Sequence, residues 1–202
     1  MPTLSVTVHC GERMIRNVAG RKKLANPLQY PLDLLLMMYV LAERKGAIIH
    51  AAGIVLKEKS FVFVGRSGAG KSTLVRQFAL ADDCLVLSDD RVVIQEAGKG
   101  FGVSGTPWGG EAGNAENATR PLAGIFFLRQ APVNQIHRLD VRAAAERLLA
   151  AASIPWYDRD VAPLGVSFCA GLAERIPAYE LQFRPTVDVV DLLIRHAENY
   201  RA

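Results

Sequence analysis

Residues 65–72 read "GRSGAGKS" and fit the Walker A pattern G-x-x-x-x-G-K-[ST], in which each residue type serves phosphate binding. Glycines let backbone N–H groups turn towards an anion, and the helix that follows adds the positive end of its dipole. Lys71 supplies a full positive charge, and Ser72 can offer its hydroxyl to Mg²⁺. A structural glycine-rich turn is the alternative. We expect nucleotide binding by Gly65, Arg66, Ser67, Gly68, Ala69, Gly70, Lys71, Ser72 and Thr73.

The residues on both sides of this loop predict the strand and the helix that it requires. "FVFV" at 61–64 is a β-branched and aromatic run, typical of a strand, and the apolar residues within 74–78 have helical spacing. Before them, "AIIHAAGIVL" at 47–56 predicts a second strand, joined to the first by a tight turn in "KEKS".

The predicted hairpin carries one histidine towards the phosphate loop. If Leu56 pairs with Phe61 across the turn, His50 lies beside Ser67. We therefore expect His50 at the phosphate site. The alternative is a buried, hydrogen-bonded histidine in an apolar strand.

Two adjacent carboxylates follow the next apolar run, "CLVLSDDRVVI" at 84–94. The interval between Lys71 and Asp89 has room for one helix and one return strand of a right-handed crossover. Because adjacent parallel strands end on the same edge of a sheet, Asp89 and Asp90 should approach the phosphate loop. One carboxylate could then bind Mg²⁺ and the other take a proton from an attacking group. The alternative is an exposed turn that caps Arg91.

A long irregular segment lies between the strands expected in "GKGFGVSG" and "LAGIFFLRQ". Residues 104–120 are rich in Gly, Asn and Pro, and we expect them to close over a substrate. Trp108 could stack on a base or an acceptor side chain, or anchor the loop to the core. Glu111 could bind metal or a backbone amine. Arg120 could compensate transition-state charge, and Arg66 could reach the γ-phosphate; solvent-facing side chains are the alternative for both.

Composition and charge exclude several classes of protein. The chain has 202 residues, about half of them hydrophobic, and a net charge of +4. The basic cluster Arg21–Lys23 is expected to be a solvated loop, so no nucleic-acid partner is predicted. Three cysteines without C-x-x-C spacing argue for a reducing compartment. The most apolar segment, 32–42, is too short to span a bilayer, so a soluble, cytoplasmic protein without a membrane partner is expected.

The periodicity predicts a single domain, 1–202, with three parts. Residues 1–30 are poorly defined, although 1–9 alternate weakly like an edge strand. The nucleotide-binding core is expected over 31–130, and it begins with a helix between Pro31 and Gly46. A C-terminal extension of helices and one strand, 131–202, is expected to pack on that core.

Together, "IIHAAGIVLKEKSFVFVGRSGAGKST" and "LSDDRV" resemble the catalytic core of the bacterial HPr kinase/phosphorylase family. The resemblance covers about residues 45–95. It implies an α/β fold with the P-loop nucleotide-binding core shared with ATP-dependent phosphoenolpyruvate carboxykinase, a mixed β-sheet flanked by helices. It also implies that Asp89, His50 and Lys71 are catalytic, with Asp89 as general base, that Ser72 and Asp90 hold Mg²⁺, and that ATP is the cofactor.

The chain also departs from that family. Its large N-terminal domain and its later glycine-rich signature are missing, and Arg66 stands where the family usually has an acidic residue. The chain is more similar to smaller kinase-like proteins that accompany peptide-modification gene clusters. We therefore expect transfer of the γ-phosphoryl group to a hydroxyl, such as a serine of a peptide or protein other than HPr. Relatives are often oligomers, so a homo-oligomer fits the resemblance. The alternatives are a nucleotide-binding regulatory or assembly module and a small-molecule kinase.

Overall fold

The computed structural model of the chain describes residues 5–79, 84–184 and 186–198. The helices are α1 (Leu32–Glu43), α2 (Lys71–Phe78), α3 (Val141–Ala151), α4 (Ala162–Arg175) and α5 (Asp188–Glu198), with a short 3-10 helix at Glu12–Met14. The strands are β1 (Ile15–Val18), β2 (Arg21–Leu24), β3 (Gly46–Leu56), β4 (Lys59–Val64), β5 (Cys84–Ser88), β6 (Arg91–Ala97), β7 (Gly100–Gly105), β8 (Thr119–Gln130), β9 (Gln135–Arg138) and β10 (Ala178–Phe183).

Strands β3 to β10 form one mixed, eight-stranded sheet in the order β4-β3-β6-β7-β8-β10-β9, with β5 paired to β3. The two long strands, β3 and β8, each change partner along their length. β3 pairs first with β6 and then with β4 and β5, whereas β8 passes from β7 to β4 and β10. The predicted α/β class, a mixed sheet flanked by helices, is confirmed.

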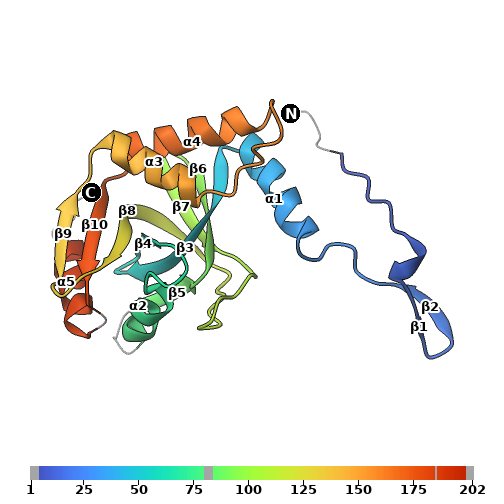
Figure 1. Ribbon diagram of the computed structural model, residues 1–202, viewed down its shortest axis with the longest axis horizontal. Coiled ribbons are helices and arrows are strands. Elements are labelled where there is room, and N and C mark those ends of the chain that lie inside the picture. Colours follow the sequence, from blue (N-terminus) through green and yellow to red (C-terminus); the bar gives the residue numbers. More distant parts are fainter. Residues whose placement is uncertain (1–4, 80–83, 185, 199–202) are drawn as a thin grey trace.

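Helices cover both faces of this sheet (Figure 1). On one face, α3 and α4 pack against alternate strand residues such as Val62 and Ile125. On the other, α2 and α5 pack against Phe63 and Phe126, whose rings stack at 5.3 Å. Because both faces are buried, the central strands are apolar at nearly every position, as in "FVFV" of β4. None of the described helices is long and apolar enough to cross a membrane.

The predicted hairpin of β3 and β4 exists, but its register is two residues tighter than expected. Leu56 pairs with Lys59 instead of Phe61, because the turn contains only Lys57 and Glu58. Both turn residues have positive φ, 48° and 64°, as a two-residue turn that matches the strand twist requires. Pairing with β4 ends at Ala51, and His50 pairs instead with Arg91 of β6.

The crossover expected after α2 also differs from the prediction. β5 does not lie beside β4; both strands are antiparallel to β3 and flank it on opposite sides. β4 and β5 therefore still run in the same direction and end on the same edge of the sheet. β3 lies between those two ends, and this strand carries His50.

The N-terminal segment extends away from the rest of the molecule (Figure 1). The edge strand expected over 1–9 is not formed in its described part, 5–9. The cluster Arg21–Lys23, expected in a loop, instead lies in β2, which pairs with β1 in a separate two-stranded sheet. Apolar and polar residues alternate over too few positions in 15–24 to have predicted these two short strands.

Candidate active site

The phosphate-loop sequence lies between the end of β4 and the start of α2, as predicted. Gly70 precedes the helix with a φ of 99°, and a Cβ on it would meet Cζ of Phe183 at 2.8 Å. A Cβ on Gly65 would meet Cβ of Ala69 at 2.7 Å. Only glycine therefore suits either position, and Gly70 to Thr73 at the start of α2 line the cleft beside the loop.

Lys71, the first residue of α2, points back across the loop. It is only 7% exposed, and its Nζ donates to the carbonyl oxygen of Gly65 at 2.7 Å. Nζ also lies 2.9 Å from Nε2 of His50. Burial lowers the pKa of Lys71 from its ordinary value, while Asp90, Asp89 and then Glu111 act in the opposite direction. The ammonium group thus sits among carboxylates without forming a close ion pair with any of them.

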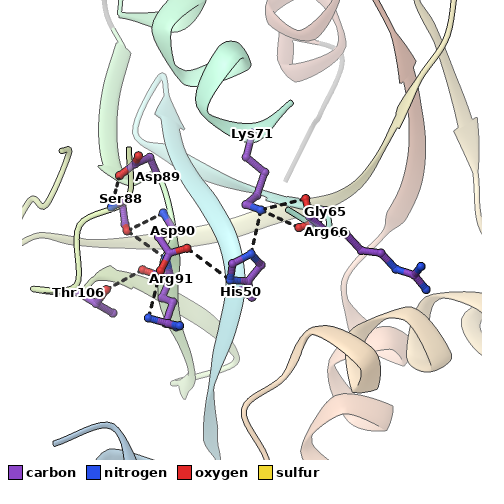
Figure 2. Close-up of polar contacts among 10 residues, drawn as sticks. His50, Gly65, Arg66, Lys71, Ser88, Asp89, Asp90, Arg91 and Thr106 are labelled. Atoms are coloured by element: carbon purple, nitrogen blue, oxygen red, sulfur yellow. Dashed lines mark hydrogen bonds and ion pairs between the residues drawn. The ribbon is translucent and has the colours of Figure 1, made fainter. Parts of the chain in front are cut away.

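His50 lies between Lys71 and Asp90 (Figure 2). Since a lysine ammonium can only donate, Nε2 of His50 must accept its hydrogen bond, which places the imidazole proton on Nδ1. Nδ1 lies 3.5 Å from Oδ1 of Asp90. Burial, and then the positive charge of Lys71, lower the pKa of His50, against the opposing effect of Asp90. His50 is therefore a neutral bridge between a cation and an anion.

The two carboxylates after β5 have different surroundings. Asp89 is 2% exposed, and its oxygens accept the backbone N–H groups of Gly110 at 2.9 Å and Ala112 at 2.7 Å. Asp90 is more exposed and also pairs with Arg91, 3.1 Å from its Oδ2. Asp89 thereby fastens residues 110–112 to the site, while Asp90 faces His50.

These side chains share one cleft of about 270 Å³. Its lining residues are His50, Ser67, Gly68, Gly70, Lys71, Ser72, Thr73, Asp89, Asp90, Gly110, Glu111 and Gln130. The structure thus brings together His50, most of the phosphate loop, both carboxylates and Glu111. Glu111 was expected near the substrate only because it belongs to the irregular segment 104–120. The expected proximity of His50 and the carboxylates to Lys71 is observed, although the register and strand order used to predict it were different.

Two of the residues expected over the phosphates lie elsewhere. Arg120 is the second residue of β8 instead of lying in the loop, and its Nε donates at 3.1 Å to Glu58, which lies in the β3–β4 turn. That turn is at the opposite end of β4 from the phosphate loop, about 20 Å away at 3.3 Å per residue. The structure therefore places Arg120 away from the phosphates and favours the solvent-facing alternative. Arg66 offers its carbonyl to Lys71 at 3.4 Å, but its side chain points away from the cluster (Figure 2).

Trp108 anchors its loop instead of lining the cleft. Its indole Nε1 donates to Oδ2 of Asp33 at 2.9 Å, in the first turn of α1. The anchoring alternative is thus the one observed. Through this bond, the loop that contributes Gly110 and Glu111 is tied to the point where the N-terminal segment joins the body.

Three positioning residues were missed by the sequence reasoning. Ser88 is fully buried, and its Oγ accepts the N–H groups of Asp90 and Arg91, both at 3.3 Å. Thr106 donates to the carbonyl oxygen of Arg91 at 2.8 Å. Gln130 donates to the carbonyl oxygen of Gly68 at 2.9 Å. A serine directly before two aspartates is a turn signal that could have indicated Ser88, whereas the other two contacts join distant segments.

Among the residues that the structure describes, no group of three His, Cys, Asp or Glu side chains is arranged to hold a metal ion by itself. Ser72 and Asp90 nevertheless line the same cleft. This donor set suits Mg²⁺, which keeps several waters and takes phosphate oxygens together with one or two protein oxygens.

Comparisons with known proteins matched the chain to one family model and to a group of solved structures. A family model described as "SynChlorMet cassette protein ScmC" matches residues 27–186. The solved structure of the Hpr(Ser) kinase/phosphatase from Coxiella burnetii is similar over 75% of this chain and 95% of that chain, with 10% sequence identity and a TM-score of 0.43. No curated protein sequence matches the chain.

Proposed function

The chain belongs to the family of the SynChlorMet cassette protein ScmC, and from its cleft we propose that it is an ATP-dependent, Mg²⁺-requiring phosphotransferase. The γ-phosphoryl group would pass to a hydroxyl, such as a serine of a peptide or protein. The observation that carries this proposal is that Lys71 of a complete Walker A loop shares one cleft with His50 and two carboxylates.

Phosphoryl transfer asks a protein mainly to position the reactants and to stabilise negative charge. The loop amides and Lys71 would bind the phosphates, and Ser72 and Asp90 would hold Mg²⁺, which when bound neutralises charge on the phosphate oxygens. His50 would keep the Lys71 ammonium aimed across the loop. Each of these roles uses a group that already lines the cleft.

Asp89 is the proposed general base. The acceptor hydroxyl would give its proton to a carboxylate oxygen of Asp89 while its oxygen forms a bond to the γ-phosphorus. The bond from that phosphorus to the bridging oxygen would break, and ADP would leave with the electron pair. Each oxygen of Asp89 accepts one backbone N–H group, and a carboxylate oxygen has a further lone pair for this proton.

A second assignment of the base is supported by the contact between Asp90 and His50. Asp90 is the more exposed of the two carboxylates and is not engaged by the loop amides. In that case Asp89 would serve to hold residues 110–112 in place. Undiminished transfer by Asp89→Asn, together with loss of transfer in Asp90→Asn, would favour this second assignment, because a variant that lacks the base cannot keep the wild-type rate.

The test of the proposal is transfer itself. Purified protein with Mg²⁺ and γ-labelled ATP should label a serine-containing acceptor encoded in the same cassette, and Lys71→Met should abolish the labelling. Labelling of a free alcohol or small metabolite but of no peptide would favour a small-molecule kinase. Nucleotide binding without any transfer would contradict the proposal and favour a regulatory or assembly module.

A further inference from the structure

The hairpin of β1 and β2, residues 15–24, is a two-stranded sheet that stands apart from the rest of the molecule (Figure 1). All residues of both strands are exposed, including Ile15, Val18 and Leu24. Neither outer edge pairs with another strand of the described chain. An isolated hairpin is only marginally stable in water, and its open edges accept further strands, so we expect this element to bind a partner.

The positive charge of the chain is concentrated here. Residues 1–30 hold five cations and one anion, a net charge of +4 that equals the net charge of all 202 residues. These residues are Glu12, Arg13, Arg16, Arg21, Lys22 and Lys23. The remaining chain is therefore neutral overall, and the partner of the hairpin should be acidic.

The register gathers the cations on one face of the hairpin. Arg16 lies directly opposite Lys23, and Val18 lies opposite Arg21. Paired residues of antiparallel strands point to the same side, so three cations surround one valine on this face. Like charges placed directly opposite each other are unfavourable, and an anion between them removes that cost.

We propose that this hairpin docks an extended, acidic polypeptide, which adds as a third strand and directs its carboxylates to Arg16, Arg21 and Lys23. Two features favour a polypeptide over a nucleic acid. The open strand edges offer backbone N–H and C=O groups, which another strand satisfies. The segment 12–24 contains no aromatic residue on which a base could stack.

The docked polypeptide would lie on the side of the molecule that leads to the cleft. The hairpin joins the body at the start of α1, where Asp33 accepts the indole N–H of Trp108. Two residues further, the same loop reaches Gly110, which binds Asp89, and Glu111, which lines the cleft. If the proposed function holds, the acidic polypeptide is the segment through which the acceptor substrate is recognised.

Binding can be measured without catalysis. The probe is a fluorescein-labelled peptide of alternating glutamate and valine, titrated with the full chain in the absence of nucleotide and followed by fluorescence anisotropy. We expect binding that weakens as salt is raised. The variant Arg16→Glu/Arg21→Glu/Lys23→Glu should bind at least about tenfold more weakly. The matched control Lys99→Glu/Arg142→Glu/Arg159→Glu makes the same charge change on exposed residues of the body and should bind as the wild type does.

Strand addition has its own test. A probe N-methylated at alternate residues keeps its charges but cannot pair along a strand edge, and it should bind markedly more weakly. Equal binding by the methylated probe, equal binding by the hairpin variant, or tighter binding of an RNA oligonucleotide, an anionic vesicle or a second copy of the chain would overturn the proposal.

The two proposals fail separately. If the acidic peptide does not bind but labelled ATP is still transferred to an acceptor, the docking proposal is wrong and the kinase proposal stands. If the peptide binds with the expected variant pattern but no acceptor is labelled, the kinase proposal is wrong and the docking surface stands. Thermal unfolding of the hairpin variant should match that of the wild type, because the exchanged side chains are exposed.

Discussion

Nε2 of His50 accepts a hydrogen bond from Nζ of Lys71 at 2.9 Å, which requires the imidazole to be neutral. Protonation of His50 would put a hydrogen on Nε2, so that this N–H and the ammonium group of Lys71 would face each other as two donors. It would also add a second positive charge beside the buried ammonium group. The state of this histidine therefore controls the position of Lys71, the residue proposed to bind the phosphates.

The rate of phosphoryl transfer should consequently fall as the pH is lowered below 6.5. Burial and Lys71 lower the pKa of His50 below its ordinary 6.5, so the folded protein binds fewer protons than the unfolded chain near that pH. The contribution to stability is thus present above pH 6.5 and is lost as the pH falls through the lower, folded-state pKa. Nucleotide affinity and the thermal midpoint, measured from pH 8 to 5, should both decline.

The variant His50→Gln keeps an acceptor for Lys71 without a titrating group, so it should flatten this decline. His137→Gln, at an exposed histidine away from the cleft, is the control and should leave the pH profile unchanged. An unaltered acidic decline in His50→Gln would show that another group is responsible. His196, whose pKa is also lowered by burial, is the first to examine in that case.

Asp89→Asn should reduce transfer by about 10²- to 10⁴-fold, the range for loss of a general base. The amide also brings an N–H₂ group to a place where Oδ1 and Oδ2 accept from Gly110 and Ala112, so the loop should loosen. Rates at saturating ATP and nucleotide affinity, measured separately, distinguish the two effects. Undiminished turnover in Asp89→Asn, together with loss in Asp90→Asn, would assign the base to Asp90.

Two neighbouring glycines provide a matched pair that tests the contact between the loop and Asp89. A Cβ on Gly110 would lie 2.6 Å from Oδ2 of Asp89, whereas a Cβ on Gly109 would meet nothing closer than 3.8 Å. Gly110→Ala should therefore displace the loop and lower transfer at least about tenfold, the loss for about 1.4 kcal/mol. Gly109→Ala should behave as wild type. Similar activities in the two variants would show that the loop position does not matter to the reaction.

A second glycine pair tests the packing of the phosphate loop. Gly68 and Gly70 both have positive φ, 80° and 99°, so alanine at either should cost about 1–2 kcal/mol of backbone strain. Only Gly70→Ala also brings a Cβ to 2.8 Å from Phe183; at Gly68 the added Cβ meets nothing within 4 Å. Chemical denaturation should find Gly70→Ala the less stable of the two. Equal losses would mean that Phe183 shifts freely.

Arg120→Ala should leave phosphoryl transfer unchanged. Its ion pair with Glu58 is on the surface at the far end of β4, and such pairs contribute about 0–1 kcal/mol to stability. Transfer rates with saturating nucleotide provide the check. A large fall in the rate, without loss of stability, would return Arg120 to the active site.

Local patterns in the sequence determined the phosphate loop and the strand and helix beside it, whereas the mixed α/β class was expected from the resemblance to the HPr kinase/phosphorylase family. They succeeded because "GRSGAGKST" and "FVFV" satisfy local requirements: glycine conformations, a helix start and a run of β-branched and aromatic residues that favours a strand. The expected meeting of His50, Lys71 and Asp90 is also observed. That expectation was based on a pairing of Leu56 with Phe61 and on β5 lying beside β4, and the structure has neither.

Only the tertiary structure decided that β3 separates β4 from β5 and that Asp89 holds the loop at Gly110. It also decided that Arg120 pairs with Glu58 and that Trp108 binds Asp33. Each depends on contacts between residues far apart in the chain, which local spacing does not encode. The N-terminal hairpin is the same case: Arg16 and Lys23 are only two cations in a polar stretch until pairing sets them opposite each other. Local backbone chemistry thus determined how a phosphate could be bound, and long-range packing decided which groups surround it.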